Sequence, residues 1–117
     1  MGITKEVLHK NLRRKDVIVL NVLPEDDFLK LHIQFSHHVP LFQNRGLFSA
    51  EVEKQFGRDK YFITYSADIT CAAAQNASAA LKARGLNAQT YLGGLKEWRE
   101  AGLPVEGTQA KQLVPAR

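Results

Sequence analysis

Several features are missing from this sequence of 117 residues, and each absence excludes a class of protein. A single cysteine cannot form an internal disulfide, so the chain is not a disulfide-stapled secreted domain. No apolar run is long enough to span a bilayer, and the N-terminus lacks the apolar segment of a signal peptide. We therefore expect a cytoplasmic protein that does not insert into a membrane.

Concentrated charge and clustered metal ligands are also missing. The formal net charge is +4 and the pI about 9.4, but the basic residues are dispersed apart from Arg13, Arg14 and Lys15. This cluster follows the first expected helix, where cations complement the helix dipole, so a solvated helix end is favoured over a patch for nucleic acid or another partner. His37 and His38 have no carboxylates or further histidines at the spacing that metal ligands require. We expect no nucleic acid, no metal and no cofactor.

What the sequence does contain is an alternation of strand and helix patterns. Its 44% hydrophobic and 24% charged residues are typical of a globular protein, and its length suits one core. Aliphatic and β-branched runs predict strands, and amphipathic or alanine-rich runs between them predict helices. The expected strands are residues 16–22, 39–41, 61–65 and 88–92; the expected helices follow Thr4, Pro24 and Ser49 and span 72–84 and 95–101.

This order predicts an α/β fold with a parallel sheet of four or five strands and helices on both faces. Thr4 and Ser49 are the expected N-caps, Gly46 interrupts the chain before the latter, and Gly85 suits a left-handed helix end. We place one domain at residues 1–106 and expect residues 107–117, which show no periodicity, to be a frayed tail.

The segment SADITC, residues 66–71, joins the expected strand 61–65 to the alanine-rich helix. Ligands of parallel α/β sheets bind beyond the carboxyl ends of the strands, where this segment lies. A turn from strand to helix also presents backbone N–H groups and the positive end of the helix dipole to an anion. The segment begins with Ser66 and ends with the only cysteine, Cys71. No Ser-His-Asp pattern surrounds Ser66, so we do not expect a hydrolase nucleophile there.

Several segments, in the same order along the chain, resemble the rhodanese-like domain, a family of sulfurtransferases with phosphatase relatives. The resemblance covers about residues 4–106, and its ordered, collinear segments carry more weight than any single motif. They are VIVLNV at 17–22, PEDDF at 24–28, HI at 32–33, VP at 39–40, Tyr65, Cys71, the run 77–81, Gly85, YLGGL at 91–95, Trp98 and AGLPV at 101–105.

The resemblance implies transfer of a sulfane sulfur from thiosulfate or a persulfide to a thiol or cyanide acceptor. In the family a cysteine directly after the central strand carries that sulfur, and here Ser66 holds the position. A serine hydroxyl is not ionised near neutral pH without a base and cannot store a sulfane sulfur, so we predict little or no activity for this chain. The substrate-binding loop that the resemblance implies consists of Ala67, Asp68, Ile69, Thr70 and Cys71.

Three interpretations of the loop remain open. Ser66 replaces the nucleophile and leaves an anion-binding cradle, or Cys71 is a displaced nucleophile at the helix start, where the dipole favours a thiolate. The third, favoured over the second, is that Cys71 is a small buried thiol. The alternative function is a non-catalytic module that binds an anion, a persulfide or a protein partner. A phosphatase is least favoured, because the loop lacks an arginine that can clamp phosphate.

Other departures from the family lie outside the loop and should affect the fold little. Asn21 stands where the family usually has aspartate, Leu23 where it often has arginine, and Gln34-Phe35 replaces the usual Pro-Gly. We further expect His32 to bond a loop carbonyl.

Overall fold

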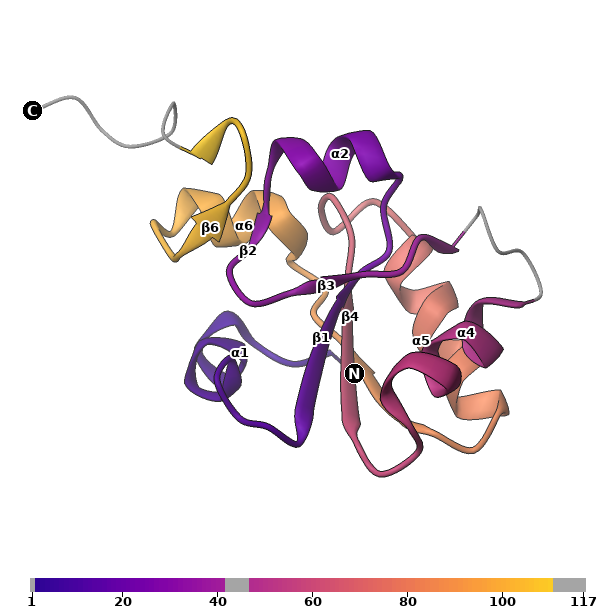
Figure 1. Ribbon diagram of the computed structural model, residues 1–117. Helices are drawn as coiled ribbons and strands as arrows, with labels where there is room; N and C mark the ends of the chain where they lie inside the picture. The colour runs from indigo at the N-terminus through magenta and orange to yellow at the C-terminus, as the bar shows by residue number, and fades with distance from the viewer. Residues whose placement is uncertain (1, 42–46, 111–117) are drawn as a thin grey trace, which may run out of the picture.

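The computed structural model describes residues 2–41 and 47–110, and it has a four-stranded sheet at its centre (Figure 1). The strands are β1 (Val17–Asn21), β3 (His37–His38), β4 (Tyr61–Tyr65) and β5 (Asn87–Thr90), in the order β3-β1-β4-β5. All three pairings are parallel, and a further parallel bridge joins Ile3 to Tyr91. The predicted α/β fold with a parallel sheet is confirmed.

Helices cover both faces of this sheet, as predicted. One face carries α1 (Lys5–Asn11) and α6 (Gly94–Glu100), and the other carries α4 (Phe48–Phe56) and α5 (Ala73–Ala83) (Figure 1). All five residues of β1 and four of the five in β4 are buried, because both strands lie between the two helix layers. The remaining helix, α2 (Glu25–Lys30), follows β1 and buries none of its residues.

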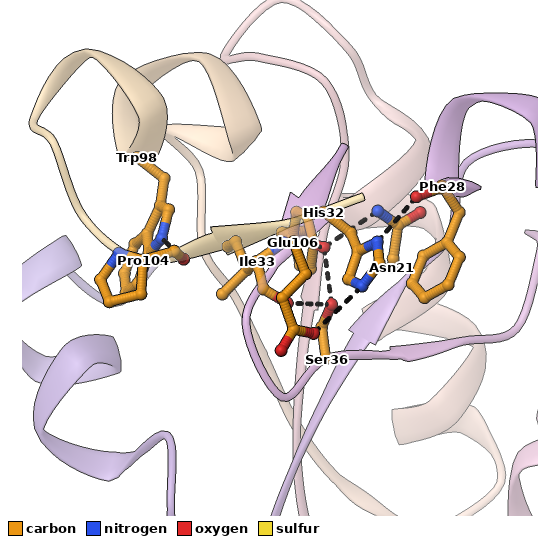
Figure 2. Close-up of polar contacts among 9 residues, drawn as sticks. Asn21, Phe28, His32, Ile33, Ser36, Trp98, Pro104 and Glu106 are labelled. Carbon is orange, nitrogen blue, oxygen red and sulfur yellow. Dashed lines mark hydrogen bonds and ion pairs between the residues drawn. The ribbon is translucent and has the colours of Figure 1, made fainter. Parts of the chain in front are cut away.

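The predicted helix ends at Thr4 and Gly85 are confirmed, because each depends on the conformation and hydrogen bonds of a few neighbouring residues. Thr4 caps α1, since its Oγ1 accepts a hydrogen bond from the Val7 N–H at 3.2 Å. Gly85 follows α5 with φ 88°, the left-handed conformation that glycine adopts without steric cost. Trp98 of α6 is fully buried, and its Nε1 donates to the Pro104 carbonyl at 2.7 Å (Figure 2).

The prediction that Ser49 caps α4 was wrong. The helix begins at Phe48, two residues earlier than a Ser49 cap implies, with Leu47 before it and no side-chain cap. Packing explains the difference, because Phe48 and Val52 lie on one face of the helix and both are buried in the core. Gly46, expected to interrupt the chain here, lies outside the described residues.

The short strand expected at residues 39–41 was also wrong, because the pairing lies two residues earlier. β3 pairs through Leu20↔His37 and Asn21↔His38, after which β1 has ended and offers no further ladder. The following residues keep single contacts: the Val39 N–H donates to the Asn21 carbonyl at 3.1 Å. Two residue pairs therefore define the position of this edge strand.

A second, two-stranded sheet was not predicted. β2 (His32–Ile33) pairs antiparallel with β6 (Val105–Glu106), so the chain end returns to the segment after α2. His32 bonds a backbone carbonyl through Nδ1 at 2.7 Å, but this carbonyl belongs to Phe28 of α2 and not, as expected, to a loop. Its Nε2 lies 3.4 Å from Glu106 Oε1 (Figure 2). The chain continues along α2: the N–H groups of residues 108 and 109 donate to carbonyls of residues 29 and 30. Residues 111–117 of the expected tail lie outside the described residues.

Candidate functional site

The candidate loop, residues 66–71, lies at the carboxyl edge of the parallel sheet. β4 ends at Tyr65 beside the end of β1, and α5 begins at Ala73 immediately beyond the loop. The start of α6 holds the loop from one side: the Leu95 N–H donates to the Ser66 carbonyl at 2.9 Å, and the Lys96 N–H to the Ala67 carbonyl at 2.8 Å. The loop is thus bound to two helix starts.

Ser66 points into the loop rather than to solvent. Only 2% of the residue is exposed, and its Oγ donates to the Cys71 carbonyl at 3.3 Å. This hydrogen bond joins the first residue of the loop to the last. None of the hydrogen bonds found for the Ser66 hydroxyl in the described part of the chain links it to a histidine or carboxylate that could act as its base.

Asp68 shapes the turn in the middle of the loop. Its Oδ1 accepts from the Thr70 N–H at 3.0 Å and from the Thr70 Oγ1 at 2.6 Å. Hydrogen bonds from Thr70, first the hydroxyl and then the backbone N–H, lower the pKa of the Asp68 carboxyl. Asp68 is therefore an ionised turn-former at neutral pH, and its charge lies at the entrance to the loop.

Cys71 is only partly exposed, and it packs against the core cluster beneath α4 and α5. Desolvation acts to raise the pKa of its thiol, but a hydrogen bond from the Ser66 side chain lowers it. The backbone N–H groups of Ala73 and Ala67 lower it further, while the charge of Asp68 acts in the opposite sense. The net pKa of Cys71 lies below its ordinary value.

The start of α5 supplies part of this environment. No side chain caps the helix, because the residue before it is Ala72. The first N–H groups of the helix therefore remain available to the loop, together with the positive end of the dipole. Two of the backbone N–H groups in this region, those of Ala73 and Ala67, act on the thiol of Cys71.

Glycine is required where α6 meets the loop. Gly94 has φ 70°, and a Cβ placed there would lie 2.8 Å from the backbone of Asp68 and from the Ser66 carbonyl oxygen. Such a contact is shorter than real Cβ contacts, so any larger residue would displace the loop. The Gly93-Gly94 pair in the YLGGL motif serves the site directly through this close approach.

A shallow cavity of about 290 Å³ opens between the loop and α6. Its lining carries three carboxylates, from Asp68, Glu97 and Glu100, against one ammonium group, from Lys96. Ile69 stands at its edge with 71% of its surface exposed. The entrance is therefore acidic, in contrast to the positive net charge of the whole chain.

A buried polar cluster supports the strand ends beneath the loop (Figure 2). The Tyr65 hydroxyl accepts from Asn21 Nδ2 and from the Ile33 N–H, each at 2.9 Å, and lies 2.9 Å from Ser36 Oγ. Asn21 Oδ1 also accepts from the Leu23 N–H at 2.9 Å. Asn21, which replaces the aspartate usual in the resembling family, thus contributes both a donor and an acceptor.

His37 and His38, for which the sequence indicated no metal site, make other contacts in the structure. His38 Nε2 lies 2.7 Å from the Leu23 carbonyl, and the His37 ring packs edge-on to Phe56 at 5.0 Å between centroids. Across residues 2–41 and 47–110, no group of three or more His, Cys, Asp or Glu side chains is arranged to hold a metal ion. Within those residues, no helix combines the length and apolar character needed to cross a membrane.

Comparison with known proteins identifies the family. The family model for the rhodanese-like domain matches residues 4–101. This chain belongs to the rhodanese-like domain family. No curated protein matched it in the same comparison. The chain is therefore a module of a sulfurtransferase family.

Solved structures agree on the rhodanese-like fold. The BH2092 protein of Bacillus halodurans matches with a TM-score of 0.81 at 22% identity, over 95% of this chain and 80% of its own. The rhodanese-like domain of the Anabaena sp. Alr3790 protein matches with a TM-score of 0.79 at 19% identity, over 99% and 85%. A rhodanese-related protein of Thermoplasma volcanium matches with a TM-score of 0.73 at 28% identity, over 90% and 96%.

Sequence reasoning placed the loop correctly between β4 and α5, but it missed part of the site. The acidic lining from Glu97 and Glu100 comes from α6, whose surface residues carried no recognised motif. The fully buried thiol favoured for Cys71 is not observed, since the residue keeps intermediate exposure. The YLGGL motif was a usable signal, because its second glycine contacts the loop backbone.

Proposed function

We propose that this rhodanese-like domain carries a sulfane sulfur on Cys71, with Ser66 as a residue that positions Cys71 rather than a nucleophile. The observation that carries the proposal is the placement of Cys71, which is partly exposed beside the uncapped start of α5 and held by the hydrogen bond from Ser66 to its carbonyl. The Ser66 side chain and the backbone N–H groups of Ala73 and Ala67 also lower the pKa of the thiol. The thiolate is the reactive form of cysteine, so a lowered pKa favours reaction near neutral pH.

The proposed transfer has two steps that balance without an external oxidant or reductant. In the first, the Cys71 thiolate attacks the outer sulfur of a persulfide donor; the donor S–S bond breaks, and the donor thiolate leaves with its electron pair. In the second, a thiol or cyanide acceptor, reacting as its anion, attacks the outer sulfur of the Cys71 persulfide. The S–S bond at Cys71 breaks and the Cys71 thiolate is regenerated.

The acidic entrance favours some donors over others. Thiosulfate is a dianion, and the carboxylates of Asp68, Glu97 and Glu100 line the cavity beside the loop. Like charges in one cleft repel, which raises the cost of bringing thiosulfate to the thiol. We therefore propose a persulfide of lower negative charge as the donor. Low activity with thiosulfate, which we predict from Ser66, is therefore also expected from repulsion between thiosulfate and these carboxylates.

The test is the intact mass of the protein after incubation with cysteine persulfide, and separately with thiosulfate, each followed by cyanide. We expect the persulfide to add one sulfur atom that cyanide removes, and thiosulfate to add less. The Cys71→Ser variant should gain nothing. A folded wild-type protein that gains no sulfur from either donor would contradict the assignment of Cys71.

That outcome would favour the second candidate, a non-catalytic cradle. Its support is Ser66, which is buried and hydrogen bonded across the loop, at the position that the resemblance assigns to the family nucleophile. Such a module would bind a small oxyanion or a persulfidated partner without reacting. Sulfate or thiosulfate would then raise the melting temperature of the protein while leaving its mass unchanged.

A further inference from the structure

A second cavity, of about 450 Å³, lies far along the chain from the candidate loop. It opens between the residues that follow α1 and those that precede β3, against the first residues of β1. Leu12 and Val17 form part of its apolar lining, and Arg13, Lys15, Phe35 and His37 contribute groups that a ligand could contact. No step of the proposed sulfur transfer uses any of these residues.

Phe35 is the unusual residue of this cavity. Its φ is 70°, and it is the only residue other than glycine with positive φ in the described part of the chain. Left-handed backbone is unfavourable for a bulky side chain, and glycine adopts it without steric cost. The ring is nevertheless 45% exposed, so core packing does not account for its presence. A strained residue with an exposed aromatic ring indicates a binding role.

Arg13 is placed beside this ring. Its guanidinium carbon lies 5.6 Å from the centroid of the Phe35 ring, within the range of a cation–π contact. The contact orders a long cationic side chain at the cavity without neutralising its charge. Exposed aromatic and arginine residues are enriched at the centres of protein interfaces, where they contribute most of the binding energy.

The charge at this cavity is positive. Arg14 is paired with Asp16, through contacts of 3.0 and 2.8 Å. Arg13 and Lys15 have no carboxylate partner among the described residues. The ring of His37 packs on Phe56, and partial desolvation lowers the pKa of His37, so at neutral pH the charge comes from the arginine and lysine.

We propose that this cavity docks an acidic segment of a protein partner, with an apolar side chain of that segment against Phe35 and its carboxylates near Arg13 and Lys15. Charge complementarity selects an acidic partner. Nucleic acid is disfavoured, because nucleic-acid sites extend as longer basic stripes with a reading element, whereas the cations here lie within one cavity.

The location of the cavity allows docking and sulfur transfer to occur together. Val17 at the cavity begins β1, and Asn21 ends it beside Tyr65, directly before the loop. Ser36 and His37, on the other wall of the cavity, lie nearer the loop end of β1, beside Tyr65 and Leu20. The cavity shares no lining residue with the loop or with the acidic cavity beside it, so a partner can dock here without contacting Cys71. The docking proposal does not depend on the proposed function.

The test is fluorescence anisotropy with a labelled peptide of Glu and Asp residues around one central Phe, at low salt. Phe35→Gly removes the ring and suits the backbone there, and Lys15→Glu reverses one charge. We expect each to weaken peptide binding about tenfold. Lys82→Glu, at an exposed position of α5, makes the same charge change elsewhere and should alter binding less than about twofold. Replacing the peptide Phe by Gly should weaken binding to the wild type but not to Phe35→Gly.

Circular dichroism of each variant establishes that it is folded before binding is measured. Three results would overturn the proposal: no binding of the peptide by wild-type protein, equal binding by folded Phe35→Gly, or tighter binding of a single-stranded oligonucleotide than of the peptide. The mass gain on Cys71 is measured on the same variants. Its persistence in Phe35→Gly would separate a failure of docking from a failure of the sulfur chemistry.

Discussion

The Tyr65 hydroxyl offers the sharpest test of how this fold is held together below its loop. The hydroxyl accepts hydrogen bonds from Asn21 Nδ2 and the Ile33 N–H, both buried. Ser36 Oγ donates to the Ile33 carbonyl at 2.6 Å, so its own proton is used and the Tyr65 hydroxyl donates to it. Tyr65→Phe would remove one oxygen and leave two buried N–H donors without an acceptor.

The magnitude follows from those two donors. A buried donor that loses its partner costs about 1–3 kcal/mol, so the variant, with two such donors, should lose about 2–6 kcal/mol of unfolding free energy. Domains of this size have about 5–15 kcal/mol in total. At about 4 °C per kcal/mol, the melting temperature should fall by about 8–24 °C. Ser36 is half-buried, so we expect water to replace its lost contact at little cost.

The assay is thermal and urea unfolding of Tyr65→Phe beside Tyr61→Phe, a matched control in the same strand. Tyr61 is 36% exposed, and its hydroxyl makes no hydrogen bond within the described residues, so its removal should cost little. Equal losses in the two variants would refute the reasoning, because they would mean that the Tyr65 contacts add nothing to stability.

The pH dependence of stability gives a second readout for the same residue. Burial raises the pKa of Tyr65 to about 12, against about 10 in the unfolded chain. Unfolded protein therefore loses its proton first, and the stability that the neutral hydroxyl contributes is complete below pH 10 and lost as the pH rises through 12. Wild-type protein should lose stability over this range more steeply than Tyr65→Phe. Parallel alkaline profiles would contradict the assignment.

Three further substitutions test the site and the strained turn. Ser66→Cys should form more thiocyanate from cysteine persulfide and cyanide than wild-type protein does, and a folded variant without this gain would count against the placement of residue 66 as the family nucleophile. Gly94→Ala should lower stability by about 1–3 kcal/mol and slow the reaction of Cys71 with a thiol reagent, because its Cβ would displace the loop backbone. Unchanged reactivity would mean that the loop tolerates the contact. Phe35→Gly should raise unfolding free energy by about 1 kcal/mol through loss of left-handed strain, which urea unfolding measures; a clear loss would show that the ring stabilises the fold.

Local patterns in the sequence predicted most of the fold. The strand at residues 61–65 matched β4 at both ends, since a short run of aromatic and β-branched residues is a strong strand signal and Ser66 and the loop follow it at once. Thr4 and Gly85 were correct because capping and left-handed backbone depend on a few neighbouring residues. Ser49 failed because burial of Phe48 moved the helix start.

The remaining errors and omissions concern contacts between distant segments. The pairing of β2 with β6 joins residues about seventy positions apart, through two-residue strands too short to show a period. The same limit applies to the site: the loop was found from its strand–helix context, whereas the carboxylates of Glu97 and Glu100 reach it only through packing of α6. Sequence patterns reflect contacts between residues that are close along the chain, whereas a functional site combines residues that are distant in sequence and close in space.

The hydrogen bonds from α6 to the loop allow the amides of α6 to be used to detect opening of the loop. The Leu95 and Lys96 N–H groups belong to the first turn of α6, where helix geometry provides no acceptor, and the carbonyls of Ser66 and Ala67 take that place. Any opening of the loop must therefore expose these two amides to solvent. Their hydrogen-exchange rates would measure the opening directly, including any change when sulfur is loaded on Cys71.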